Sequence, residues 1–195
     1  IVSEVGPDAV TIRSGERSES IPARTVLWAA GVQASPLGRI LASATGATLD
    51  GVGRVVVEPD LSVAGHPEIF VIGDMAHFSH QTGTPLPGVA QVAMQQGRYV
   101  ARLVQRRLHG QTMPAASYRD YGSMAAIGRA AAVADLGWIR ISGFVAWLAW
   151  LFIHLISLVG FENRVLVFVQ WAWNYFTRNR SARLITGENP LPFRH

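Results

Sequence analysis

The 195-residue sequence contains no cysteine and no lysine, and only 15% of its residues are charged. Without cysteine the chain cannot form a disulfide, a thiolate zinc site or an iron–sulfur cluster, so redox chemistry requires a bound cofactor. The 17 basic residues, all arginine, outnumber 13 acidic residues and give a formal net charge of +4. They do not form a basic stripe with interleaved aromatic rings, so we predict no nucleic-acid partner.

A glycine-rich dinucleotide-binding loop, Gly-x-Gly-x-x-Gly, is also missing. The nearest string, Gly51-Val52-Gly53, continues as Arg54-Val55-Val56 and does not fit the pattern. The chain alone is therefore not expected to bind a dinucleotide well. It opens at Ile1 with two strand-like runs that have no partner sheet of their own, and we expect a C-terminal fragment of a larger protein.

Apolar residues make up 49% of the chain, which excludes intrinsic disorder and allows a folded core. Up to about residue 136, short runs rich in Val, Ile and Thr alternate with Gly/Pro turns, a pattern typical of an α/β domain. We expect strands at Ile1–Val5, Ala9–Arg13, Thr25–Ala29, Arg54–Val57, Ile69–Ile72, Ser123–Ile127 and Ala131–Ala134.

One helix is predicted from about Pro87 to Leu108, followed by a stop at His109-Gly110. Spacings of three and four residues define one face of this helix. That face contains Val89, Val92, Ala93, Gln96, Val100, Leu103 and Val104.

Residues 141–161 form an apolar stretch with a single ionisable group, His154. As one helix, 21 residues would extend about 31 Å, close to the thickness of a bilayer's hydrocarbon core. We expect a membrane-associated helix, either a transmembrane helix or one that lies in a single leaflet. The alternative is a buried core helix of a soluble protein.

An aromatic and basic segment follows, and amphipathic rings beside arginines are typical of a membrane interface. The rings are Trp171, Trp173 and Tyr175, and the arginines are Arg178, Arg180 and Arg183. Because positive residues that flank apolar segments are retained in the cytoplasm, we expect the cytoplasmic face of a bacterial-type inner membrane.

Glu68-Ile69-Phe70-Val71-Ile72-Gly73-Asp74 is the most specific local string. A buried strand that ends in Gly-Asp is the way in which flavoproteins with two dinucleotide-binding domains present a carboxylate to the ribityl hydroxyls of FAD. Upstream, Trp28-Ala29-Ala30-Gly31 ends another apolar run where such a chain passes between its two nucleotide domains.

These two strings, followed by the segment Gly88–Gly97 (Gly-Val-Ala-Gln-Val-Ala-Met-Gln-Gln-Gly), resemble the C-terminal half of the type II NADH:quinone oxidoreductases. The resemblance continues through residues 118–135 and 142–164 and covers about residues 20 to 186. It implies an α/β, Rossmann-like flavoprotein part followed by a helical membrane-associated tail.

In domain terms the resemblance implies four segments. These are a remnant of the NADH-binding domain (1–31), the C-terminal part of the FAD-binding domain (32–115), a strand pair (116–136) and the membrane-associated region (137–195).

The implied activity passes electrons from NADH through FAD to a membrane quinone in the respiratory chain, without proton pumping. The implied FAD contacts are Trp28, Ala30, Gly31, Gly73, Asp74, Ala90 and Gln91, and the implied quinone contacts are Gln91, Gln95, Met124 and Ile127. No residue is assigned as a catalytic acid or base. Membrane lipid is an implied partner, and a homodimer is left open.

Two other functions remain open: a soluble pyridine-nucleotide flavoprotein reductase, and a non-enzymatic membrane-anchoring module. His77 and His80 follow Asp74 at spacings that could hold a metal ion, but such residues in a loop are more typical of ordinary solvated side chains. We therefore predict no metal site.

Overall fold

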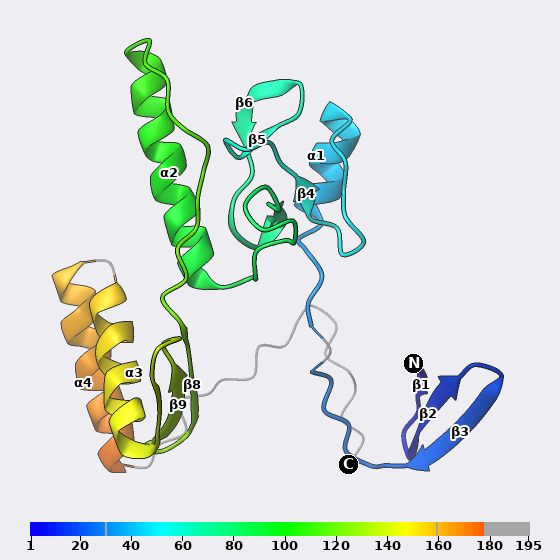
Figure 1. Ribbon diagram of the computed structural model, residues 1–195. Coiled ribbons are helices and arrows are strands. Elements are labelled where there is room, and N and C mark those ends of the chain that lie inside the picture. The colour runs from blue at the N-terminus through cyan, green and yellow to red at the C-terminus, as the bar shows by residue number, and fades with distance from the viewer. Residues whose placement is uncertain (30, 159, 178–195) are drawn as a thin grey trace. The chain divides into compact units, whose positions relative to one another are not determined.

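The computed structural model describes residues 1–29, 31–158 and 160–177 (Figure 1). The chain divides into two compact units, Ile1–Tyr118 (unit 1) and Arg119–His195 (unit 2), and each is described by itself.

Unit 1 begins with a three-stranded antiparallel sheet in the order β1-β2-β3. Strands β1 (Val2–Val5) and β2 (Ala9–Ser14) confirm the two runs expected at the start of the chain. Strand β3 (Arg17–Pro22) was not expected, because its first four residues are polar and all six are exposed. It forms through backbone pairing with β2 across a two-residue turn at Gly15, which has a φ of +61°.

The rest of unit 1 is a mixed α/β arrangement of short elements. Two pairs of strands form, β4 with β7 in parallel and β5 with β6 antiparallel. The elements are α1 (Leu37–Thr45), β4 (Val55–Val56), β5 (Ser62–Val63), β6 (His66–Phe70), the 3-10 turn η1 (Gly73–Met75), β7 (Ala76–His77) and α2 (Ala90–Leu108).

A small apolar core lies between these elements. Its buried members are Val55, Val57, Leu61, Val63, Val71, Ala76 and Phe78. Tyr99 and Val100 of α2 pack against this cluster, so the helix is held beside the strands that flank η1. The core therefore fixes the turn that carries Asp74.

Several expected boundaries need correction. Residues Thr25–Ala29 form no strand: within the part of the chain that the structure describes, nothing pairs with them, and Leu27 is 89% exposed. The run expected at Ile69–Ile72 belongs to a strand that ends at Phe70, and the run at Arg54–Val57 contributes only Val55–Val56. An apolar run alone does not make a strand, because a strand needs a hydrogen-bonded neighbour.

Helix α2 confirms the predicted helix and its end at Leu108, but it begins at Ala90 rather than at Pro87. The backbone of Val89 is extended, and its N–H donates to the carbonyl of Pro87 at 3.0 Å. This tight turn removes Pro87 and Gly88 from the helix.

Unit 2 contains an antiparallel sheet in the order β10-β9-β8. Strands β8 (Ser123–Gly128) and β9 (Ala131–Asp135) confirm the expected pair to within one residue, and β10 (Arg140–Ser142) is added to it. Helix α3 (Gly143–Ser157) packs on this sheet through Ala146, which is buried with Ala132 and Ala134.

The apolar stretch 141–161 is not one helix. Helix α3 has 15 residues, and α4 (Phe161–Thr177) has 17. Leu158 is extended at the end of α3, and Gly160 has a φ of +85°, so the backbone is not helical at either of these two residues. At about 1.5 Å per residue, α3 extends roughly 22 Å. Across residues 1–29, 31–158 and 160–177, no helix combines the length and apolarity required of a membrane span.

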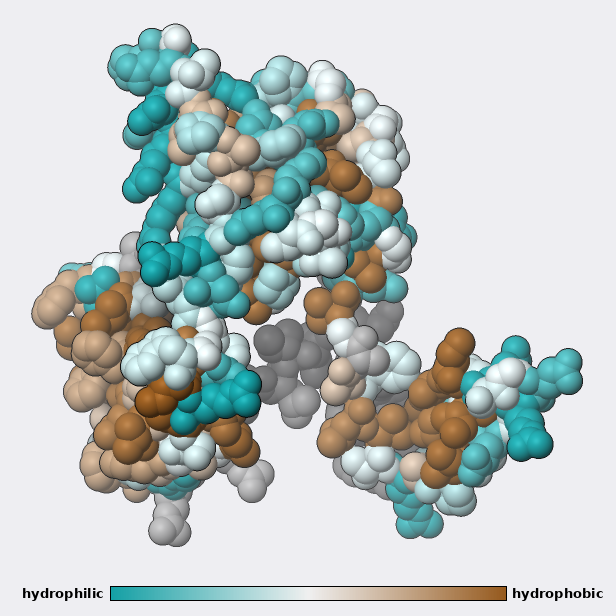
Figure 2. All heavy atoms as spheres, in the orientation of Figure 1, coloured by the Kyte–Doolittle hydropathy of each residue, from teal (hydrophilic) through white to brown (hydrophobic). Residues whose placement is uncertain are grey.

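Helices α3 and α4 run antiparallel and are joined by aromatic contacts. The rings of Trp150 and Trp171 stack with centroids 5.6 Å apart, and those of Trp147 and Tyr175 lie 5.5 Å apart. Many other apolar side chains of this pair face solvent, and Figure 2 shows them gathered over unit 2. Arg178, Arg180 and Arg183 of the expected interfacial cluster lie outside the described residues.

Candidate functional site

Asp74 lies beside the chain segment that enters helix α2. After β6, the chain continues through Val71, which is 6% exposed, and turns at Gly73 into η1. A Cβ atom placed on Gly88 would lie 3.5 Å from Oδ1 of Asp74. Gly88 precedes the first residue of α2 by two positions, so the carboxyl group and the start of the helix are neighbours.

Gly73 makes the second connection between this turn and α2. Its N–H donates a 2.6 Å hydrogen bond to Oε1 of Gln96. Its φ of +66° is in the region that favours glycine, and an added Cβ would approach the Cβ of Ala93 to 3.2 Å. The turn therefore packs directly on the amino-terminal half of α2.

The start of α2 offers donors to an anion or to an electron-rich group. The first N–H groups of a helix have no carbonyl four residues earlier, and they mark the positive end of the helix dipole. Val89, the N-cap residue, makes no side-chain cap hydrogen bond, and no acidic residue lies in the first turn of α2. Ala90 and Gln91, which the family resemblance implies as flavin contacts, are the first two residues of the helix.

Gln91 and Gln95 are half-buried and lie four residues apart on α2. Residues at this spacing share one helical face. Both belong to unit 1, whereas Met124 and Ile127, the other residues expected to contact a quinone, belong to unit 2.

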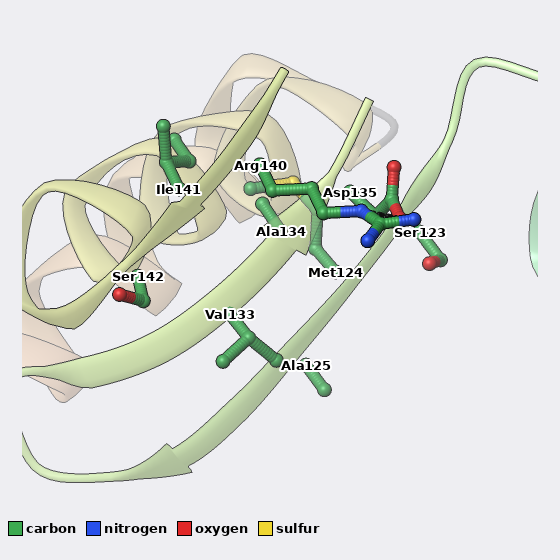
Figure 3. Close-up of a pocket in the computed structure, with 9 residues that line it drawn as sticks. All are labelled: Ser123, Met124, Ala125, Val133, Ala134, Asp135, Arg140, Ile141 and Ser142. Atoms are coloured by element: carbon green, nitrogen blue, oxygen red, sulfur yellow. Dashed lines mark hydrogen bonds and ion pairs between the residues drawn. The ribbon is translucent and has the colours of Figure 1, made fainter. Parts of the chain in front are cut away.

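Met124 and Ile127 have different surroundings on β8. Met124 is half-buried and packs against the Ala132–Ala134–Ala146 cluster. It also lines a pocket of about 360 Å³ formed by β8, β9 and β10, which Figure 3 shows with the Arg140–Asp135 ion pair. Ile127 is 72% exposed and does not line that pocket.

The upstream residues of the predicted FAD set are less enclosed. Trp28 is 66% exposed, and Gly31 has a φ of +91°. Ala30 lies outside the described residues. In the described part of the chain, neither Trp28 nor Gly31 shares a hydrogen bond, an ion pair or a ring contact with Asp74.

His77 and His80, which suggested a metal site, each have a protein partner instead. Nδ1 of His77 contacts Oδ2 of Asp50 at 2.9 Å, and Nε2 of His80 contacts the carbonyl of Val57 at 2.7 Å. Within the described ranges, no three side chains of metal-ligating type come together.

Gln96 is the site residue that the sequence reasoning missed. Its side chain is 5% exposed, and it occupies the apolar face of α2 between Val92 and Leu103, which are also buried. A polar residue at an apolar position of the helical pattern was the signal that could have found it, because buried polar groups are almost always hydrogen-bonded.

Two family models match the chain. The pyridine nucleotide-disulphide oxidoreductase model matches residues 2–97, and the NDH2 C-terminal domain model matches residues 121–179. Together they include both the Gly73-Asp74 turn and the α3–α4 pair.

Curated relatives have the same family name. The type II NADH:quinone oxidoreductases NdhA and Ndh of Mycobacterium tuberculosis are 40% and 39% identical over 194 and 193 residues. Each alignment covers 96% of this chain and 40% of the relative. The enzyme of Staphylococcus haemolyticus is 37% identical over 120 residues, which is 60% of this chain and 28% of that protein. The chain thus spans about 40% of the length of the first two relatives.

Solved structures agree on the fold. NDH2 from Plasmodium falciparum in complex with NADH matches with a TM-score of 0.71 at 15% identity, covering 93% of this chain and 51% of that one. The same protein in complex with RYL-552 matches with a TM-score of 0.68 at 16% identity, covering 93% of this chain and 52% of that one. At this identity the likeness concerns the fold alone. From the two family models and the identity to the mycobacterial proteins, the chain belongs to the type II NADH:quinone oxidoreductase family.

Proposed function

We propose that the complete protein oxidises NADH and reduces a membrane quinone, that FAD passes the electrons between them, and that no protons are pumped. The relatives' names support this reaction. The structural observation that carries the proposal is the position of the Asp74 carboxyl group beside Gly88, at the start of α2.

The residues around Asp74 suit FAD. The exposed carboxylate of Asp74 can accept hydrogen bonds from sugar or ribityl hydroxyls. Gly73 lets the turn pack closely on Ala93, and Gly88 leaves room for the Asp74 carboxylate beside the start of α2. The start of α2 favours the electron-rich edge of a reduced ring. When bound, FAD supplies the hydride acceptance and the onward electron transfer. In this proposal Trp28, Ala30 and Gly31 border the cofactor from the upstream segment.

Gln91 and Gln95 are the residues we propose for the quinone. Their amide groups are neutral donors that can hold a quinone carbonyl without adding charge. Met124, half-buried in the wall of the unit 2 pocket, and the exposed Ile127 would contribute apolar contact. All four assignments concern substrate positioning, and none makes these residues an acid or a base.

We further propose that α3 and α4 lie in the surface of the lipid bilayer, on the cytoplasmic side of a bacterial inner membrane. Large exposed apolar surfaces are typical of membrane or protein interfaces. Phe152, Val169 and Trp173 are 64%, 56% and 66% exposed. Quinones partition into lipid, so a lipid-facing surface gives the oxidant access. Light scattering of the detergent-solubilised protein would tell whether a second copy shares this surface.

The test uses the full-length protein with its upstream part. We expect a yellow protein that requires detergent and oxidises NADH with a quinone acceptor. Asp74→Ala should lose FAD while keeping its circular dichroism spectrum. Glu58→Ala removes an exposed acid from the same unit and should retain FAD.

The outcomes separate this function from its alternatives. A protein that is yellow and active without detergent or lipid would favour a soluble flavoprotein reductase. A colourless protein that binds vesicles would favour an anchoring module. Stoichiometric FAD in Asp74→Ala would contradict the assignment of Asp74.

A further inference from the structure

We infer that Gln96 is a positioning residue for Asp74, and that it acts by accepting the hydrogen bond of the Gly73 N–H group. The inference rests on the proposed role of Asp74 in holding FAD. It assigns to Gln96 a part in cofactor binding that does not require any contact between Gln96 and the cofactor.

The hydrogen bond joins two segments that are 23 residues apart. The N–H of Gly73 lies 2.6 Å from Oε1 of Gln96, and the Gln96 side chain is 5% exposed. A buried hydrogen bond costs more to lose than an exposed one, because water cannot replace the missing partner. The hydrogen bond between Gly73 and Gln96 is therefore suited to fixing the orientation of η1 relative to α2.

The bonded group is the first N–H of η1, and Asp74 is the next residue of that turn. The N–H groups that begin a helical turn have no carbonyl partner within it. Gln96 supplies the missing acceptor from the neighbouring helix. This holds the Ile72–Gly73 peptide plane, one residue before Asp74, and so restricts the direction in which the turn presents the Asp74 side chain.

The packing of Ile72 and Gly73 against α2 also indicates that the helix positions the turn. Gly73 lies so close to Ala93 that an added Cβ would come within 3.2 Å, and the side chain of Ile72 lies 3.7 Å from a Cβ built on Gly97. Residues 93, 96 and 97 lie on one face of α2, so the helix meets the turn with two close contacts and one directional bond. The contacts set the distance between the turn and the helix, and the bond sets the orientation of the turn.

Three substitutions in the full-length protein test the inference. Gln96→Met preserves side-chain length and removes the acceptor. Gln96→Glu restores an acceptor oxygen in either protonation state. Gln105→Met makes the same change at an exposed position of the same helix.

We expect Gln96→Met to weaken FAD binding about tenfold, as measured by flavin fluorescence, because the part-buried N–H of Gly73 loses its partner. Gln96→Glu should remain within about threefold of the wild-type protein, and Gln105→Met should not change the affinity. Wild-type FAD affinity in a folded Gln96→Met protein would overturn the inference, as would an equal loss in the Met and Glu variants.

Hydrogen exchange gives a readout that does not depend on FAD. In the wild-type apoprotein the Gly73 amide should exchange slowly, although it begins an exposed turn, and in Gln96→Met it should exchange at least about tenfold faster. Fast exchange of Gly73 in the wild-type protein would overturn the inference even if Gln96→Met does not fold. Should Asp74→Ala retain FAD while Gly73 remains protected through Gln96, the assignment of Asp74 to FAD binding fails and the hydrogen bond between Gly73 and Gln96 stands.

Discussion

The Nδ1 nitrogen of His77 donates a 2.9 Å hydrogen bond to Oδ2 of Asp50, and this bond joins β7 to the loop that precedes β4. The same carboxylate accepts hydrogen bonds from Nε of Arg54 at 2.6 Å and from the backbone N–H groups of Val52 and Arg54. Because β7 follows η1 directly, the His77–Asp50 bond holds the carboxyl-terminal side of the turn that carries Asp74.

Asp50 should make the free energy of unfolding depend on pH. Burial raises the pKa of this carboxyl group, but hydrogen bonds from His77, Arg54 and Val52 outweigh it and hold the pKa well below its ordinary value. A pKa lower in the folded than in the unfolded state stabilises the fold above the unfolded pKa, near 3.9, and this contribution is lost as the pH falls toward the folded value.

Replacing Asp50 by Asn should therefore lower the free energy of unfolding by about 1–3 kcal/mol at pH 7, with a smaller difference near pH 3. Urea unfolding followed by circular dichroism from pH 7 to pH 3 measures this. Asp8→Asn, at an exposed site, is the control and should show little change at either pH. A difference for Asp50→Asn that is the same at both pH values would contradict the explanation.

The sequence was sufficient for the features that depend on local periodicity. Helix α2 and the strand pair β8–β9 followed from apolar spacing, because a helix makes its backbone hydrogen bonds within itself and β8 pairs with the strand that follows it in the chain. The Gly73-Asp74 turn and the start of α2 were singled out from the order of their motifs, and the structure brings Asp74 and Gly88 together.

Features set by backbone pairing or by hydrogen bonds between distant residues were missed. Strand β3 depends on backbone pairing with β2 and has no apolar pattern. The Gly73–Gln96 and His77–Asp50 bonds join residues 23 and 27 positions apart, and no local rule pairs them. The apolar stretch 141–161 is divided because Leu158 and Gly160 adopt non-helical backbone angles, which a hydropathy average does not register.

Gly122 should tolerate no side chain. Its φ is +94°, and an added Cβ would lie 2.3 Å from the carbonyl oxygen of Asp135. Gly122→Ala should destabilise unit 2 by at least about 2 kcal/mol, because both the backbone angle and the overlap oppose it. Gly128→Ala, where nothing lies within 4 Å of the new Cβ, should change stability little. Thermal unfolding of the two variants checks this; equal melting temperatures would contradict it.

Two tryptophans of α4 should separate packing from lipid binding. Trp171 stacks on Trp150 and is half-buried, whereas Trp173 is 66% exposed. Trp171→Ala should lower the melting temperature, because it removes an aromatic pair contact worth about 1 kcal/mol beyond its buried area. Trp173→Ala should leave the melting temperature near its wild-type value and reduce cosedimentation with anionic vesicles. Unchanged vesicle binding in Trp173→Ala would argue against our assignment of this surface.

Arg107 connects the end of α2 to the core loops. Its guanidinium donates to the carbonyl of Pro67 at 2.6 Å and to Oδ2 of Asp60 at 2.5 Å, and it lies over the Phe70 ring. Arg107→Ala should cost about 1 kcal/mol of unfolding free energy, since the pair is partly exposed. Arg107→Lys should recover less than half of that, because an ammonium group cannot make both hydrogen bonds and the stacking contact. Urea unfolding measures the series, with Arg102→Ala as the exposed control.

The antiparallel arrangement of α3 and α4 has a topological consequence. Trp147 lies one turn into α3 and contacts Tyr175, near the last residue of α4. The end of α4 therefore lies beside the beginning of α3. If α3 and α4 lie in the bilayer surface as we propose, the first turn of α3 and the last turn of α4 would share one aqueous side. No polar domain would then need to be carried across.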